Sequence, residues 1–128
     1  MKSFENNAFF WQKMDTLFLS SQLVVSKKKG EVHPLYNNLI YPVDYGYLSN
    51  TQSEGNNICV YKGSLASDRV NSVIVAVDIL KKDLDTKLIT GCTEAEEEEV
   101  LRFLNQTDFQ KTIIVRRGVE LPSWALTD

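Results

Sequence analysis

The sequence is poor in cysteine and histidine. Its 128 residues include two cysteines, Cys59 and Cys92, and one histidine, His33. The cysteines lie far apart and neither belongs to a CxxC pair, which excludes a disulfide framework and the usual zinc-binding patterns. We therefore expect both thiols to be reduced.

Long apolar runs are also missing. No stretch approaches the ~20 residues that a membrane-spanning helix needs, and residues 1–7 lack the basic and apolar regions of a signal peptide. These absences predict a cytoplasmic protein with no membrane partner. The charge balance, 14 Lys and Arg against 17 Asp and Glu for a net charge of −3, argues against nucleic acid as a partner.

The composition that remains is that of one folded unit. Hydrophobic residues make up 43% of the chain and charged residues 24%, so there is enough apolar material for a core and too little charge imbalance for disorder. We predict a single domain over residues 1–128.

Residues 7–20 have the spacing of an amphipathic helix. Apolar side chains recur three, four and seven positions apart and form a stripe of Phe10, Trp11, Met14 and Phe18. We expect this stripe to pack against a sheet, with an asparagine capping the start of the helix.

Residues 93–105 carry the clearest helix start in the chain. Thr93 and Glu96 have the spacing of a capping box, and the acidic residues 94–99 lie where the helix dipole favours negative charge. We interpret the acidic run as a solvated first turn and not as a metal cluster.

Apolar and β-branched runs predict strands at residues 23–25, 58–62, 70–80, 88–89 and 111–117. Residues 83–86 are predicted to form a hairpin turn, residues 31–57 a long loop and residues 122–128 a loose tail. Together with the helices, this order predicts an α+β fold that is mainly β, with a small curved sheet or barrel.

Tyrosines are concentrated in the long loop. Four of them, Tyr36, Tyr41, Tyr45 and Tyr47, fall within twelve residues. Prolines restrict the backbone of this loop, which a glycine also interrupts, so the phenol hydroxyls can be presented toward one point. His33 in the same loop is interpreted as bonded to backbone and not as catalytic.

Short motifs in and around this loop resemble a known family. The segment YPVDYGY at residues 41–47 matches a Tyr-Pro-x-x-Tyr-Gly-Tyr motif, and Asp85, Thr86 and Lys87 match an Asp-x-Lys element. FWQK at residues 10–13 and the two arginines at 116–117 match the beginning and the end of the family pattern. In these motifs and in the order of its elements, the chain resembles the short bacterial branch of the family I soluble inorganic pyrophosphatases.

The resemblance implies a small closed five-stranded OB-like β-barrel with two flanking helices, in a homo-oligomer. It also implies Mg²⁺-dependent hydrolysis of diphosphate to two phosphates. By resemblance, the expected catalytic residues are Tyr45 and Asp85. The expected phosphate-binding residues are Tyr41, Tyr45, Lys87 and Lys29, the last from a basic turn that is otherwise interpreted as solvated. The expected metal ligands are Glu54, Asp83 and Asp85.

The metal motif departs from the family pattern. Where the family has Asp-Gly-Asp-x-x-Asp, this chain has Glu54, Asn56 and Cys59 at the three aspartate positions. A neutral amide has no useful basicity near neutral pH, and a thiolate is a soft ligand for the hard Mg²⁺ ion. We therefore expect Mg²⁺ binding to be weak or lost, with Mn²⁺ as the alternative ion.

Two functions follow from these residues. The first is a slow, metal-dependent diphosphatase whose ligand is diphosphate or another small phosphate anion. The alternative is a catalytically inactive pyrophosphatase paralogue that binds an anion or a partner in a regulatory or structural role. An oligonucleotide-binding module, which the barrel alone would permit, is opposed by the net charge of −3.

Overall fold

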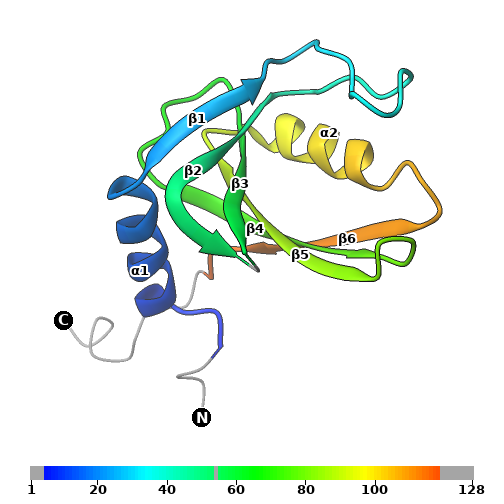
Figure 1. Cartoon of the computed structure of the whole chain (residues 1–128). Coiled ribbons are helices and arrows are strands. Elements are labelled where there is room, and N and C mark those ends of the chain that lie inside the picture. The colour runs from blue at the N-terminus through cyan, green and yellow to red at the C-terminus, as the bar shows by residue number, and fades with distance from the viewer. Residues whose placement is uncertain (1–4, 54, 119–128) are drawn as a thin grey trace.

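A six-stranded mixed sheet forms the centre of the protein in the computed structural model, which describes residues 5–53 and 55–118 (Figure 1). The strands are β1 Gln22–Lys27, β2 Asp44–Ser53, β3 Asn56–Lys62, β4 Val70–Asp78, β5 Asp83–Thr90 and β6 Gln110–Arg116. Their order across the sheet is β1-β2-β3-β5-β4-β6. Strands β3 and β5 are parallel, and every other neighbouring pair is antiparallel.

The sheet is open, with β1 and β6 as its two edges. The expected closed five-stranded barrel is therefore not confirmed, whereas the mainly β fold with two helices is. The additional strand is β2, which lies within the segment that the sequence predicted to be a loop. Because β2 is hydrogen-bonded to β1 on one side and β3 on the other, tertiary pairing outweighs its weak apolar pattern.

The turn between β4 and β5 lies earlier than predicted. Residues 83–86, expected as the hairpin turn, form the first half of β5, and residues 79–82 form the turn. Asp78 stabilises it, because its Oδ1 accepts hydrogen bonds from the backbone N–H groups of Leu80 and Lys81, both at 2.9 Å. The other predicted strands agree with the structure to within a few residues at each end.

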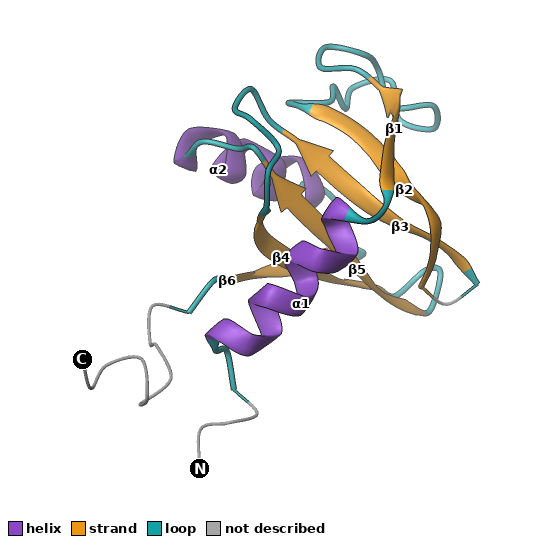
Figure 2. Cartoon of the chain, turned by 90° about the vertical axis from the view of Figure 1, so that its left-hand side faces the viewer, coloured by secondary structure: helices purple, strands orange, loops and turns teal. Residues whose placement is uncertain are grey.

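Helix α1, Ala8–Leu19, covers one face of the sheet (Figure 2). Asn7 caps it, accepting hydrogen bonds from the N–H groups of Phe9 and Phe10. Its buried residues Trp11 and Phe18 pack in a core cluster with Leu48, Val60, Val70 and Leu88. Phe10 was predicted in this stripe but is 51% exposed, because one residue of helix rotates it about 100° away from Trp11.

Helix α2, Glu94–Leu104, packs against the opposite face. Its predicted capping box is confirmed: Thr93 Oγ1 accepts from Glu96 N–H at 3.1 Å, and Glu96 Oε1 accepts from Thr93 N–H at 2.9 Å. Glu97, expected to be solvated, is instead buried and accepts hydrogen bonds from the Ser72 hydroxyl and from Arg116. The core on this face joins Val100, Phe103 and Leu104 of α2 to Tyr61, Ile74 and Ile89 of the sheet.

Arg117 fastens α1 to the sheet. Its guanidinium makes two hydrogen bonds to the Asp15 carboxylate, both at 2.9 Å, and a third to the backbone oxygen of Val70 at 2.8 Å. It also lies 5.2 Å from the centre of the Trp11 ring. Arg117, which matches the end of the family pattern, thus has a structural role here.

The predicted tail at residues 122–128 lies outside the described residues.

Among the residues that the structure describes, no helix is long and apolar enough to cross a membrane.

Gly46, within the tyrosine-rich motif, is required by the close approach of β1. A Cβ placed at Gly46 would collide with the backbone oxygen of Val24 on the neighbouring strand. We expect Gly46→Ala to reduce the free energy of unfolding by about 1–3 kcal/mol or more, as over-packing does elsewhere. Urea denaturation measures this change. Ser26→Ala, at an exposed position of β1, is the control and should change stability by less than about 0.5 kcal/mol. Equal stability of both variants would contradict the steric argument.

Candidate functional site

Polar side chains from β2, β3 and β5 line one cavity of about 830 Å³ on the face of the sheet that carries α2. We call it the polar cavity. Its principal polar residues are Tyr45, Tyr47, Asn56, Asn57, Cys59, Lys82, Asp83, Asp85 and Lys87.

Strand register brings these side chains together. Tyr47 of β2 lies opposite Cys59 of β3, and Cys59 lies opposite Lys87 of β5. Successive residues of a strand point to opposite faces, so Asp83, Asp85 and Lys87 share the face that opens into the polar cavity. Asp83, Asp85 and Lys87, all expected as site residues from the sequence, are thus placed together because side chains alternate between the two faces of β5.

Lys87 is the best-positioned cation of the cavity. Its Nζ lies 3.1 Å from Asp85 Oδ2 and 5.8 Å from the centre of the Tyr45 ring, and its side chain is only 14% exposed. Asp85 Oδ1 accepts a hydrogen bond from the Thr86 backbone N–H at 2.9 Å. Both carboxylate oxygens of Asp85 therefore already have donors, and the ammonium of Lys87 is held at a fixed place beside an aromatic face.

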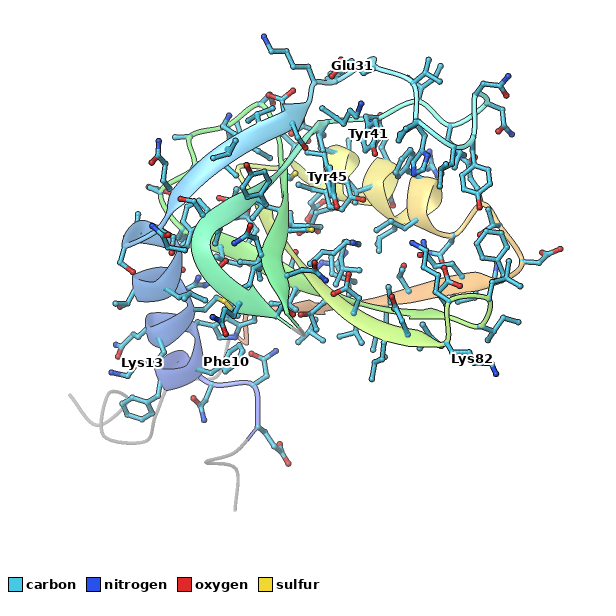
Figure 3. All side chains as sticks on the ribbon, viewed as in Figure 1. Phe10, Lys13, Glu31, Tyr41, Tyr45 and Lys82 are labelled. Carbon is cyan, nitrogen blue, oxygen red and sulfur yellow. The ribbon has the colours of Figure 1, made fainter. Side chains whose placement is uncertain are left out.

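Tyr45 is the central ring of an aromatic stack. Its ring centre lies 5.5 Å from that of Tyr41 and 4.8 Å from that of Tyr61. Burial raises the pKa of Tyr45 well above its ordinary value, and a hydrogen bond with Cys59 and the nearby groups Cys59, Tyr41 and Asp85 raise it further. The Tyr45 hydroxyl therefore keeps its proton and remains a hydrogen-bond donor. Figure 3 shows Tyr41 and Tyr45 next to each other between β2 and α2.

Tyr41 lies in a smaller adjoining cavity. The Tyr41 ring is 5% exposed and stacks on the ring of His33 at 5.9 Å. His33 Nδ1 accepts a hydrogen bond from the Leu35 N–H at 3.0 Å, which agrees with the interpretation of a loop histidine bonded to backbone. Burial, with the positive charges of Lys81 and Lys27, lowers the pKa of His33. Its imidazole is therefore neutral at neutral pH.

Two of the described site residues that the sequence predicted, Tyr41 and Lys29, are not among the polar-cavity residues. Lys29 lines a separate recess with Asp44, Lys62 and Glu96, and its backbone N–H donates to Asp44 Oδ1 at 2.9 Å. Glu54, the predicted first metal ligand, lies outside the described residues.

Metal-binding groups are sparse in the polar cavity. Within residues 5–53 and 55–118, no three His, Cys, Asp or Glu side chains lie close enough to hold a metal ion. Mg²⁺ is commonly held by one or two carboxylates together with the phosphates of a substrate. Asp83 and Asp85 fit such an ion, because they share one face of β5 and supply hard oxygen ligands. They fit an ion that arrives with a phosphate anion better than an ion bound to the protein alone.

Several residues of this site were given no site role in the prediction from the sequence. Tyr47, Asn57 and Lys82 line the polar cavity, and Tyr61 lies under the aromatic stack. Alternation from Tyr45 would have found Tyr47 if β2 had been recognised as a strand. Lys82 has no comparable signal, because its place depends on where the β4–β5 turn lies.

Comparison with known proteins supports the architecture. No family model and no curated protein sequence matches the chain. Among solved structures, an inorganic pyrophosphatase from Helicobacter pylori is similar with a TM-score of 0.53, at 16% identity over 75% of this chain and 82% of that chain. An inorganic phosphatase from Anaplasma phagocytophilum is similar with a TM-score of 0.51, at 12% identity over 73% of this chain and 81% of that chain. The protein has a pyrophosphatase-like fold. At these identities the likeness establishes the fold and not the activity.

The raised pKa of Tyr45 predicts a loss of stability at alkaline pH. The folded state keeps this phenol neutral, whereas the unfolded chain releases its proton near pH ~10. Its contribution to stability is therefore complete below pH ~10 and is lost as the pH rises toward the folded pKa. In urea denaturation between pH ~9 and pH ~11, Tyr45→Phe should lose less stability with rising pH than the wild type. An unchanged pH dependence in the variant would contradict this assignment.

Proposed function

We propose that this protein binds diphosphate in the polar cavity and hydrolyses it slowly to two phosphates with a divalent metal ion. The observation that carries the proposal is the Lys87–Asp85 pair beside Tyr45, inside a cavity of a pyrophosphatase-like fold. The likeness of fold to solved pyrophosphatases supports it.

Three groups of the polar cavity favour an anion. Lys87 offers a largely buried ammonium, whose charge is screened less by water than that of a surface lysine. Tyr45 offers a hydroxyl that remains protonated, and Lys82 adds a second, exposed cation at the turn, where Figure 3 labels it. Charge-assisted hydrogen bonds of this kind are stronger than neutral ones. They suit a small, highly charged anion.

The metal would be held by Asp83 and Asp85. When bound, such an ion neutralises charge on the diphosphate and lowers the pKa of a water molecule. Asn56 and Cys59 supply no carboxylate where the family motif has aspartates, and Asp85 already accepts from Lys87 and Thr86. Few proton acceptors remain for the attacking water. We therefore expect turnover to be slow.

Replacing Lys87 tests the binding part of the proposal. Lys87→Gln removes the cation while keeping most of the side-chain length, and should weaken diphosphate binding at least about tenfold, because a hydrogen bond to a charged group contributes about 1.5–3 kcal/mol. Isothermal titration calorimetry in the presence of Mg²⁺ measures it. Lys13→Gln, at an exposed position of α1, is the matched control and should bind like the wild type. Equal affinities in all three proteins would place the anion elsewhere.

Restoring the carboxylates tests the catalytic part. Cys59 lies opposite Lys87 in the sheet and lines the polar cavity with Asn56, so aspartates at both positions would face the same space as Asp85. We expect Cys59→Asp with Asn56→Asp to raise Mg²⁺-dependent phosphate release about 100-fold, the contribution of a positioned general base.

The choice of metal gives a second measurement of the same effect. Mn²⁺ accepts softer ligands than Mg²⁺, so it should increase the activity of the wild type more than that of the double variant. Vigorous Mg²⁺-dependent turnover by the wild type would contradict the argument that the missing carboxylates limit the rate. If diphosphate binds but no phosphate is released with either Mg²⁺ or Mn²⁺, the protein is a diphosphate-binding protein and not a hydrolase.

A further inference from the structure

A second cavity adjoins the polar cavity and has a different lining. It has a volume of about 180 Å³, and its walls include the rings of His33, Tyr36, Tyr41, Phe103 and Phe109. We call it the ring cavity. Tyr45 and Lys87 line both cavities, so the two cavities lie next to each other at these two side chains.

The rings form a continuous series along the wall. Tyr36 lies 6.2 Å from Phe109 and 5.2 Å from His33, and His33 lies 5.9 Å from Tyr41, all measured between ring centres. These separations are those of interacting aromatic pairs, and Tyr36, which is 38% exposed, leaves part of its ring accessible to another ring. An inorganic anion can contact the polar groups of this cavity but has no apolar surface to bury against its rings.

The volume limits what can enter. A cavity of about 150 Å³ accommodates one benzene molecule, and the ring cavity measures about 180 Å³. One six-membered ring therefore fills most of this volume, and a fused bicyclic ring system would have to extend beyond it.

The charges suit a phosphorylated ligand. Lys81 and Lys87 line the ring cavity, and the carboxylate of Asp78 is turned to the backbone N–H groups of its own turn. The neutral imidazole of His33 adds ring surface without charge. Lysines line both the ring cavity and the polar cavity. The phosphates of a ligand that occupies both cavities would therefore lie near a positive charge.

We propose that the natural ligand is a diphosphate ester that carries a single six-membered aromatic ring, as a pyrimidine nucleoside diphosphate does. Its ring occupies the ring cavity and its phosphates occupy the polar cavity. This inference rests on the proposed function only in placing the phosphates there, and it concerns binding and no additional chemical step.

Calorimetry on the full chain with Mg²⁺ tests it with three probes: uridine 5′-diphosphate, adenosine 5′-diphosphate and inorganic diphosphate. Stacking one base on an aromatic side chain should make the uridine compound bind about tenfold more tightly than inorganic diphosphate. The adenosine compound, with its fused rings, should show no such gain.

Two variants locate the ring. Phe109→Ala and Tyr36→Ala each remove one ring of the wall and should abolish most of the gain for the uridine compound. Neither residue lines the polar cavity, so inorganic diphosphate should bind as before. Phe10→Ala, an exposed phenylalanine of α1, is the matched control and should retain the gain. Circular dichroism confirms that each variant is folded.

The outcomes separate the two proposals. If inorganic diphosphate binds but the uridine compound binds no better, or if the gain survives both wall variants, the ring cavity is not a ligand site and the proposed function stands. Equal gains in affinity for the uridine and adenosine compounds would contradict the proposal that the ligand carries a single six-membered ring. If neither inorganic diphosphate nor the uridine compound binds, both proposals fail.

Discussion

The parallel pairing of β3 with β5 is the constraint on which the candidate site depends. It places Cys59 opposite Lys87, and the antiparallel pairing of β2 with β3 adds Tyr47 to the same row. Parallel strands cannot be joined by a tight hairpin. Here β4 makes the connection by passing to the far side of β5 and returning through the turn that Asp78 stabilises. The position of Lys87 beside Tyr45 therefore depends on β4, although no residue of β4 lines the polar cavity.

The two helices decide which part of the sheet remains available for a ligand. Helix α1 covers one face through Trp11 and Phe18, and Arg117 holds it there. Helix α2 covers only part of the other face, as burial along that face of β5 shows: Asp83 is exposed, Lys87 is half-buried and Ile89 is fully buried in the core with α2. A single strand thus passes from the polar cavity into the core, and its carboxylates and cation lie at the end that α2 leaves open.

Patterns within one segment were predictable, and pairing between segments was not. The capping box of Thr93 and Glu96 specifies α2, and the apolar spacing specifies α1, because both signals are local. Strand β2 was missed because Gly46 and its polar neighbours give no apolar alternation, and its neighbours β1 and β3 supply the stabilisation. The motifs identified Tyr41, Tyr45, Asp85 and Lys87 as candidate site residues. How these side chains lie relative to one another depends on the strand register, which the motifs do not specify. Lys29 shows the converse, since its charge alone suggested a role and the fold places it in another recess.

In the proposed function, the Lys87–Asp85 pair would couple binding of the anion to binding of the metal. A phosphate oxygen that takes the Lys87 ammonium as its partner leaves Asp85 with only the Thr86 N–H, and a half-buried carboxylate without a cation is unfavourable. A divalent ion that arrives with the anion restores the charge balance at Asp85. By the reciprocity of linked equilibria, the anion must then strengthen the binding of the ion by the same factor. In the proposed function, a site with few carboxylates would therefore use the substrate itself as part of its metal-binding site.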